Sequence, residues 1–267
     1  MKTPVPLLCL LLATFAVASL RAEHEGKVQI LLLGDSTTEG IVPRTLKPEG
    51  PHLESVIEQL LAAKGDLKPC HVINLGLSGE YIRRLLDTGR YEKAASKLPG
   101  LDWIFIRYGL NDRGRREGFI ENFPKDFKEL IALLRRDHPG AKIVPTTVIP
   151  YFADEAATTE VNDLILRVAK EEGLEVFDLH PRYAAELEKG PNLLNYRRFP
   201  VEKVPPPYQE LVKPRVIGDR VVVMDNEFDA ILGHLPGWFG DRHPNLAGYN
   251  TIADETAKWL AAKMRTP

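Results

Sequence analysis

Five short apolar runs, separated by longer amphipathic stretches, dominate the hydrophobic pattern of this chain. The runs are rich in valine, isoleucine and leucine, which is typical of strands that are buried on both faces of a sheet. We therefore predict strands at 28–33, 71–74, 103–107, 142–148 and 175–177.

The stretches between these runs repeat apolar residues at helical spacing. In HLESVIEQLLAAKG, for example, leucine, valine and isoleucine fall on one helical face, and Gly65 follows as a stop signal. Alternating strands and helices predict an α/β protein in which a five-stranded parallel sheet lies between two layers of helices. Ligands of such sheets bind beyond the carboxyl ends of the strands, so functional residues are expected just after a strand. The predicted helices are 53–63, 82–98, 125–136, 158–171 and 246–264.

Residues 190–240 interrupt this alternation. The segment is rich in proline, and Pro205-Pro206-Pro207 is compatible with neither a helix interior nor a central strand. The following RVIGDRVVVMDN predicts a β-hairpin with its turn at Gly218-Asp219. We interpret the segment as an insertion that packs over one end of the sheet, within a single domain spanning residues 23–267.

The first 22 residues resemble a signal peptide. Lys2 gives a positive start, and Leu7–Ala18 is apolar but too short to span a bilayer. Small residues favour cleavage near Ala22, with Ala18 as the second choice, while a buried N-terminal helix is the alternative interpretation. This segment predicts a secreted or periplasmic protein without an integral membrane anchor.

Composition and charge narrow the possible partners. The chain has 35 basic and 37 acidic residues, and this balance gives no indication of a nucleic-acid partner. After removal of the signal peptide only Cys70 remains, so no internal disulfide is expected and stability must come from the core. No cluster of His, Cys and acidic residues has metal-ligand spacing, so we expect neither a metal nor another cofactor.

Four polar motifs occur where the strand rule expects functional residues. GDS at 34–36, NLGLSG at 74–79 and GLND at 109–112 follow the first three predicted strands, and HPN at 243–245 precedes the last helix. Each motif alone is also typical of a plain turn. Together and in this order they resemble the motifs of the SGNH hydrolases, the GDSL-like esterase and lipase superfamily. The resemblance spans nearly the whole mature chain, and it implies a three-layer α/β/α flavodoxin-like fold and hydrolysis of carboxylic esters.

The motifs contain the residue types that ester hydrolysis needs. Ser36 is the candidate nucleophile, and His243 is the best candidate for the imidazole that takes its proton. Attack on an ester carbonyl creates an oxyanion, which preorganised donors stabilise by roughly 3 kcal/mol each. The resemblance assigns this oxyanion hole to the backbone N–H groups of Ser36 and Gly79 and to the side-chain amide of Asn111. The aspartate of the GDS motif is expected to hold the turn and to take no chemical step.

The acid of the expected triad departs from the family pattern. The family places an aspartate three residues before the histidine, whereas position 240 here is Gly240 and Asp241 lies two residues before His243. A short Asx turn would still let the Asp241 carboxylate reach the ring, where its role is to fix the tautomer and the orientation. We predict Asp241 as the acid, with Asp225 and Asp229 as alternatives.

Two further groups of residues near the motifs have more than one interpretation. Trp238 and Phe239 could stack on a sugar ring or an acyl group, and core packing explains them equally well. Arg113, Arg115 and Arg116 could bind an acidic substrate, although a solvated loop is the simpler interpretation.

These patterns predict a secreted serine esterase that works through an acyl-enzyme and acts on a small-molecule or glycan ester. An O-acetylated carbohydrate is the preferred substrate because the protein is expected to be exported and shows no apolar lid segment. A lipid-directed esterase, such as a lysophospholipase or thioesterase, is one alternative. The other is a catalytically impaired glycan-binding protein, which the displaced aspartate suggests.

Overall fold

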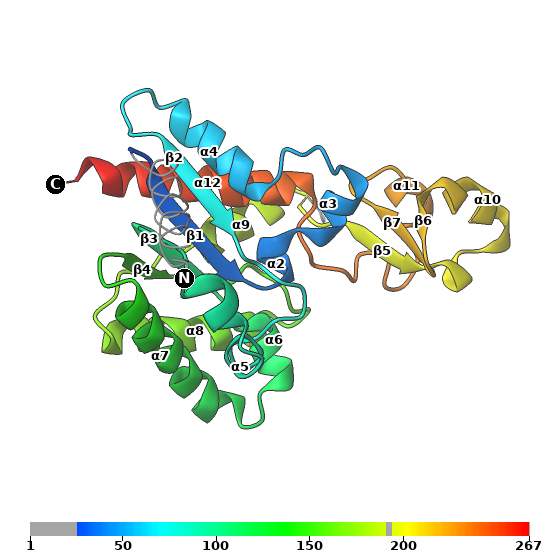
Figure 1. Ribbon diagram of the computed structural model, residues 1–267. Coiled ribbons are helices and arrows are strands. Elements are labelled where there is room, and N and C mark those ends of the chain that lie inside the picture. The colour runs from blue at the N-terminus through cyan, green and yellow to red at the C-terminus, as the bar shows by residue number, and fades with distance from the viewer. Residues whose placement is uncertain (1–25, 191–193, 267) are drawn as a thin grey trace, which may run out of the picture.

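A parallel four-stranded sheet in the order β2-β1-β3-β4 forms the centre of the protein (Figure 1). The computed structural model describes residues 26–190 and 194–266, so the predicted signal peptide lies outside the described residues. Because all neighbouring strands are parallel, their carboxyl ends lie at one edge of the sheet. The strands are β1 (Val28–Gly34), β2 (Cys70–Asn74), β3 (Trp103–Arg107) and β4 (Lys142–Pro145).

The prediction of a fifth strand in this sheet is wrong. At this position only one parallel bridge forms, between Thr146 and Phe177. The Phe177 N–H donates to the Pro145 carbonyl, and the Thr147 N–H donates to the Phe177 carbonyl. The next bond toward Glu175 would need an N–H at Pro145, which proline lacks, so the ladder cannot extend in that direction.

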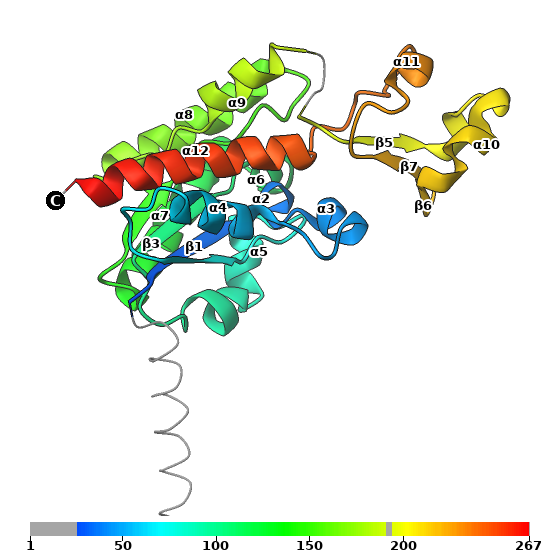
Figure 2. The same ribbon diagram turned by 90° about the horizontal axis from the view of Figure 1, so that it is seen from above.

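Helices cover both faces of the sheet, which confirms the predicted three-layer α/β/α architecture (Figure 2). Alternate residues of β1 point to opposite faces. Leu31 and Leu33 pack with α5, α7 and α8, whereas Ile30 and Leu32 pack with α4 and α12. The helices of these layers are α4 (Leu53–Ala62), α5 (Ile82–Asp87), α7 (Phe119–Asp137), α8 (Glu155–Glu171), α9 (His180–Leu187) and α12 (Leu246–Arg265).

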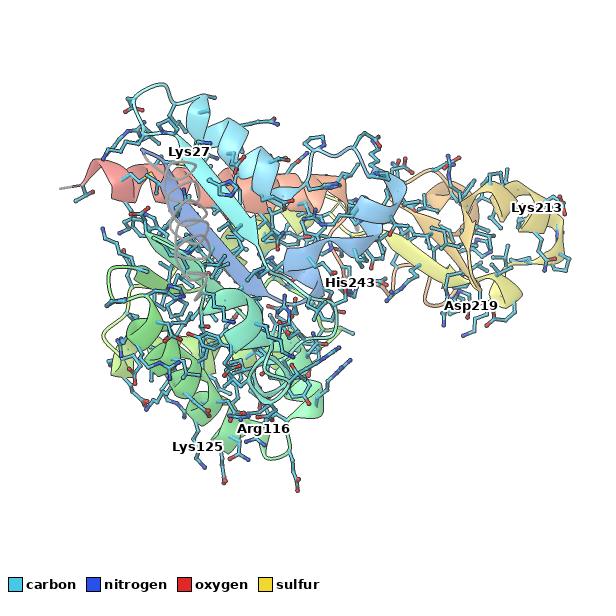
Figure 3. All side chains as sticks on the ribbon, viewed as in Figure 1. Lys27, Arg116, Lys125, Lys213, Asp219 and His243 are labelled. Atoms are coloured by element: carbon cyan, nitrogen blue, oxygen red, sulfur yellow. The ribbon has the colours of Figure 1, made fainter. Side chains whose placement is uncertain are left out.

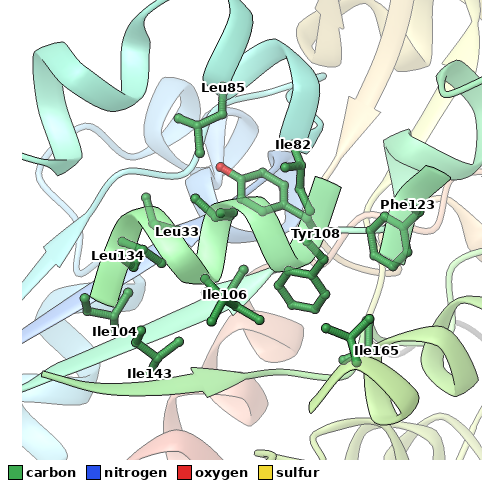
Figure 4. Packing of buried hydrophobic residues seen from close by; sticks show 14 of the residues in the cluster. Leu33, Ile82, Leu85, Ile104, Ile106, Tyr108, Phe123, Leu134, Ile143 and Ile165 are labelled. Atoms are coloured by element: carbon green, nitrogen blue, oxygen red, sulfur yellow. The ribbon is translucent and has the colours of Figure 1, made fainter. Parts of the chain in front are cut away.

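The core beneath α7 is a cluster of buried apolar side chains. Figure 4 shows Leu33, Ile104 and Ile106 of the sheet facing Leu134 of α7 and Ile165 of α8. All five are at most 1 % exposed. This layer forms a rigid support for the loops that leave the carboxyl ends of β1 and β3.

One predicted helix differs from the observed structure. The segment 82–98 does not form a single helix, because α5 ends at Asp87 and a π-helical turn, η1 (Tyr91–Ala95), follows it. Gly89 lies between them with φ at +68°, in the left-handed region, which interrupts a right-handed helix. Short helices follow the first and third strands, namely α2 (Ser36–Glu39), α3 (Ile41–Leu46) and α6 (Leu110–Arg115).

The insertion forms a second, three-stranded antiparallel sheet in the order β5-β7-β6. Its predicted hairpin at Gly218-Asp219 is observed between β6 and β7. The insertion extends beyond the carboxyl edge of the main sheet (Figures 1 and 2) and has an apolar cluster of its own, around Phe199, Val221 and Trp238. Its elements are β5 (Arg197–Pro200), η2 (Val201–Lys203), η3 (Pro206–Tyr208), α10 (Gln209–Val212), η4 (Lys213–Arg215), β6 (Val216–Ile217), β7 (Arg220–Val223) and α11 (Asp229–Leu232).

Candidate active site

Ser36 lies at the point where β1 ends and α2 begins. Asp35 caps α2, and its carboxylate accepts hydrogen bonds from the backbone N–H and the hydroxyl of Thr37, both at 2.8 Å. A Cβ atom at Gly34 would lie 2.1 Å from Thr38 Oγ1, so only glycine permits this close turn. The glycine and the aspartate therefore shape the turn that exposes the serine.

The carboxyl group of Asp35 is buried beneath the serine turn. Burial raises the pKa of Asp35, while the hydrogen bonds from Thr37 and the charges of Arg107 and His243 act in the opposite direction. Arg107, which is also buried, donates to the carbonyl of Thr37 and to the hydroxyl of Thr38. These contacts bind the serine turn to the carboxyl end of β3.

The His243 ring lies between the Ser36 hydroxyl and the Asp241 carboxylate. Its Nε2 is 2.9 Å from Ser36 Oγ, and its Nδ1 is 2.7 Å from Asp241 Oδ1. A carboxylate only accepts, so the proton of the neutral ring belongs on Nδ1, and Nε2 is left to accept from the serine. Figure 3 shows His243 at the junction between α2 and the insertion.

The spacing of Asp241 and His243 has a local explanation. Asp241 Oδ1 accepts from the backbone N–H of His243 at 3.0 Å as well as from the ring, which is the geometry of an Asx turn. The two-residue offset therefore still brings the carboxylate to the ring. The alternative acids are engaged elsewhere, because Asp229 binds Arg197 and the Trp238 indole while Asp225 accepts from the backbone of the insertion.

An arginine also contacts the Asp241 carboxylate. Arg198, from β5 of the insertion, places its Nε 2.8 Å from Asp241 Oδ2. Burial would raise the pKa of Asp241, but the hydrogen bonds and charge of His243, together with the charge of Arg198, lower it below its usual value. Asp241 thus remains ionised, as an acid that orients an imidazole must.

The three expected oxyanion donors lie around one cavity. Ser36, Gly79 and Asn111 line an open cavity of about 310 Å³ together with His243. Gly79 has φ at +71°, which favours glycine at this position. The Asn111 amide donates to the Glu80 carbonyl at 3.1 Å, and this bond orients the side chain while its second N–H stays available.

The loop that carries Gly79 is held by two acids, Glu39 and the buried Glu80. Ser78 binds Glu39 through both its N–H and its hydroxyl. The Glu80 carboxylate accepts from Tyr108 at 2.7 Å and pairs with Arg90 at 2.6 Å. These contacts fix the positions of the residues on either side of Gly79.

The turn before Asn111 depends on one buried aspartate. Asp112 accepts from the N–H groups of Ile82 and Gly109, both at 2.9 Å. Burial raises the pKa of Asp112 to about 7, against the lowering effect of these two donors. Asp112 therefore ties the β3 loop to α5 and fixes the start of the helix on which Asn111 lies.

Several residues of the cavity were not predicted from the sequence. The Tyr151 hydroxyl lies 3.2 Å from His243 Nε2, the Tyr196 ring is nearly parallel to the imidazole at 5.6 Å, and the Tyr249 hydroxyl donates to the Ser36 carbonyl at 3.0 Å. Tyr151 follows β4 closely, so the strand-end rule could have found it. Tyr196 comes from the insertion, where no pattern indicated a functional residue.

The residues with two interpretations separate clearly in the structure. Trp238 is fully buried in the apolar cluster of the insertion, and Phe239 packs against that cluster, which supports core packing for both. Arg113 pairs with Glu160 and Arg116 pairs with Asp126. Arg115, in contrast, lines the cavity.

The GDSL-like lipase/acylhydrolase family model matches residues 32–251, a range that contains all four motifs. The chain belongs to the GDSL-like lipase/acylhydrolase family. It is therefore a carboxylic ester hydrolase. No group of three or more His, Cys, Asp or Glu side chains in residues 26–190 and 194–266 could hold a metal ion.

Solved structures share the fold of this GDSL-like hydrolase at low sequence identity. One is an α/β hydrolase enzyme from the metagenome of Lake Arreo, with 21 % identity, a TM-score of 0.55, and coverage of 91 % of this chain and 98 % of the other. Another is an acetylxylan esterase from Geobacillus stearothermophilus, with 18 % identity, a TM-score of 0.55, and coverage of 91 % and 96 %. No curated protein matches the chain significantly.

Proposed function

We propose that this ester hydrolase is an exported serine esterase that removes acetyl groups from a carbohydrate. The contacts of His243 carry the catalytic part of the proposal, with 2.9 Å to Ser36 Oγ on one side and 2.7 Å to Asp241 Oδ1 on the other. A hydroxyl, an imidazole and a carboxylate in this order support removal of the serine proton during attack on a carbonyl.

In the first half of the reaction, Ser36 Oγ attacks the ester carbonyl as its proton moves to His243 Nε2. The negative oxygen of the tetrahedral intermediate then accepts from the N–H groups of Ser36 and Gly79 and from the Asn111 amide. Each donor contributes roughly 3 kcal/mol in the transition state. When the intermediate collapses, the C–O bond to the alcohol breaks, and His243 returns the proton to the leaving oxygen.

In the second half, water attacks the acyl group that is now bound to Ser36. His243 Nε2 takes a proton from this water, and the same donors hold the new oxyanion. Collapse breaks the bond to Ser36 Oγ, which regains its proton from His243 while the free acid leaves. Asp241 stays ionised throughout and holds the ring in one orientation.

Three observations support an acetylated carbohydrate as the substrate. The cavity is open and its wall contains the hydroxyls of Tyr151, Tyr196 and Ser78, which suit a polar alcohol. A structure with the same fold is named an acetylxylan esterase. The apolar segment Leu7–Ala18, which we interpret as an export signal, would bring the enzyme to extracellular or periplasmic glycans.

A lipid-directed esterase is the second candidate, and α3 is the observation that favours it. Ile41, Val42 and Pro43 of this helix line the cavity, and Ile41 is 47 % exposed. A long acyl chain could cover this apolar edge. Comparing 4-nitrophenyl acetate with 4-nitrophenyl octanoate separates the two candidates, because an acetyl esterase loses kcat/KM as the chain grows and a lipid-directed enzyme gains it.

Replacing the nucleophile tests the catalytic part of the proposal. Ser36→Ala should abolish hydrolysis of 4-nitrophenyl acetate, because it removes the Oγ atom that lies 2.9 Å from His243 Nε2. Ser96→Ala is the matched control, because Ser96 does not line the cavity and its hydroxyl donates to the Glu92 carbonyl. A Ser36→Ala protein that keeps the wild-type rate would refute the assignment.

A further inference from the structure

The wall of the catalytic cavity is cationic. It contains Arg115 and Arg198, whereas none of the described residues that line it is Asp or Glu. The whole chain has a formal net charge of −2, so this positive surface is local and not a consequence of an overall basic composition. A cleft lined by one sign of charge raises the local concentration of the opposite charge.

Most arginines around the cavity are already neutralised by acids. Arg198 pairs with Asp241, and Arg113 and Arg116 pair with Glu160 and Asp126. Arg115 differs, since no carboxylate in the described part of the chain lies within ion-pair distance of it.

Arg115 is held at the Gly79 side of the cavity by a hydrogen bond to the backbone. Its Nη1 donates to the Gly79 carbonyl at 3.0 Å, and Arg84 Nη1 donates to the same oxygen at 3.3 Å. Because both guanidinium groups donate to the same oxygen, they lie within a few ångströms of one another. Both side chains are exposed, and no acid lies between them among the described residues. Two neighbouring cations repel, and a bound carboxylate would relieve this repulsion.

We propose that Arg115, supported by Arg84, binds a carboxylate group of the substrate. The inference rests on the proposed esterase function and narrows its substrate class to esters that also carry a carboxylate, which for a carbohydrate means an acetylated acidic sugar. The planar guanidinium donates two parallel N–H bonds to a carboxylate, a geometry that a neutral hydroxyl cannot match. Because Arg115 contacts Gly79, the bound carboxylate would lie close to the scissile carbonyl.

Matched pairs of chromogenic esters test the proposal. One pair carries the charge on the alcohol, 4-acetoxybenzoate against its methyl ester. The other carries it on the acyl group, 4-nitrophenyl hydrogen succinate against its methyl ester. The readout is the ratio of kcat/KM for the anionic ester to that for the neutral ester, compared among variants so that differences in leaving group cancel.

Arg115→Gln should lower this ratio for at least one pair by roughly tenfold, the loss expected for one charge-assisted hydrogen bond at a partly solvated site. Arg115→Lys keeps the charge and should restore part of the ratio. Arg113→Gln is the matched control, because Arg113 belongs to the same helix but pairs with Glu160, and its ratio should equal that of the wild type. Added salt should lower the ratio of the wild type, since it screens the exposed guanidinium.

The ester pair whose ratio falls in Arg115→Gln shows whether the alcohol or the acyl group of the substrate carries the charge. A charge on the alcohol supports the acetylated acidic sugar. Equal ratios in the wild type and Arg115→Gln for both pairs would overturn the inference, because Arg115 would then act only by holding Gly79. Parallel assays with uncharged 4-nitrophenyl acetate separate the two levels of the account. If the wild type does not hydrolyse that ester, the proposed function itself fails.

Discussion

Ser36 and His243 reach the same cavity from two regions that are built differently. The serine turn belongs to the central α/β layers, where β1 is buried and Asp35, Arg107 and Tyr249 fix the backbone around Ser36. The histidine loop lies against the insertion. The N–H of Tyr196 donates to the carbonyl of His243 at 3.2 Å.

Further contacts continue this support of the histidine loop. The N–H of Asn245 donates to the Leu194 carbonyl at 2.7 Å, Asn195 and Pro244 form an antiparallel bridge, and Arg198 pairs with Asp241. The proposed nucleophile is therefore oriented by the common fold, whereas the proposed base and its acid are oriented largely by a segment that interrupts this fold. Changes at the residues of the insertion that contact the histidine loop should therefore alter catalysis without unfolding the sheet.

The largest expected effect concerns the acid that orients the ring. Asp241→Asn should lower kcat on the order of 10³- to 10⁴-fold, because an amide cannot hold the imidazole in the required tautomer. Asp225→Asn is the control, since Asp225 is also in the insertion region but contacts only the backbone N–H of Glu227. Steady-state kinetics with 4-nitrophenyl acetate measure both. Equal rates for Asp241→Asn and the wild type would mean that another group orients His243.

A pair of glycine substitutions compares the stability of the two regions. Gly34→Ala places a Cβ atom 2.1 Å from Thr38 Oγ1 and 3.0 Å from the Arg107 carbonyl, and such overpacking costs about 1–3 kcal/mol in the free energy of unfolding. Gly218→Ala, at the hairpin turn, meets open space but has φ at +62°, so it should cost about 1 kcal/mol.

Denaturant unfolding measures both variants, and the activity assay separates them further. Gly34→Ala should also lower kcat, because the turn that exposes Ser36 must shift, while Gly218→Ala should leave kcat unchanged. A larger loss of stability for the hairpin variant would contradict the view that the serine side is the more tightly packed region.

A smaller effect tests the link between the insertion and the triad. Arg198→Gln should lower kcat roughly tenfold, as expected for the loss of one hydrogen bond to a charged group, with little change in KM for an uncharged ester. Arg220→Gln is the control, because Arg220 lies on the neighbouring strand and pairs only with Asp219 at the surface.

Titration of Asp241 distinguishes an electrostatic role of Arg198 from a merely structural one. Arg198 helps to keep the pKa of Asp241 below its usual value, so without this cation the carboxylate takes up a proton at higher pH. The titration profile of the Asp241 carboxyl, followed by NMR, should therefore move to higher pH in Arg198→Gln and return toward the wild-type position in Arg198→Lys. An unchanged profile in both variants would indicate that Arg198 only packs against the loop.

Much of the central fold could be predicted from local patterns. The apolar run from Ile30 to Leu33 reflects burial on both faces of a sheet, and such burial can be inferred from the residue types alone. The prediction of the fifth strand was wrong for a reason that depends on strand pairing. The missing N–H of Pro145 limits the ladder only because this residue lies beside the segment that contains Phe177, and the sequence does not show which segments are neighbours.

The site shows the same division between local and long-range information. The Asx turn of Asp241 is local and could be predicted despite its unusual offset. Tyr196 and Arg198 could not, because they reach the triad through contacts between segments more than 40 residues apart along the chain. The periodicity of apolar residues along the sequence does not show which distant segments contact one another.

Covalent labelling of the serine tests the central claim most directly. A fluorophosphonate probe reacts with a serine hydroxyl whose proton is removed by a neighbouring base. Peptide mass spectrometry should find one adduct, on Ser36, that is absent from Ser36→Ala and forms much more slowly in His243→Ala. An active enzyme that carries the adduct on another residue, or that stays unlabelled at Ser36, would contradict the account.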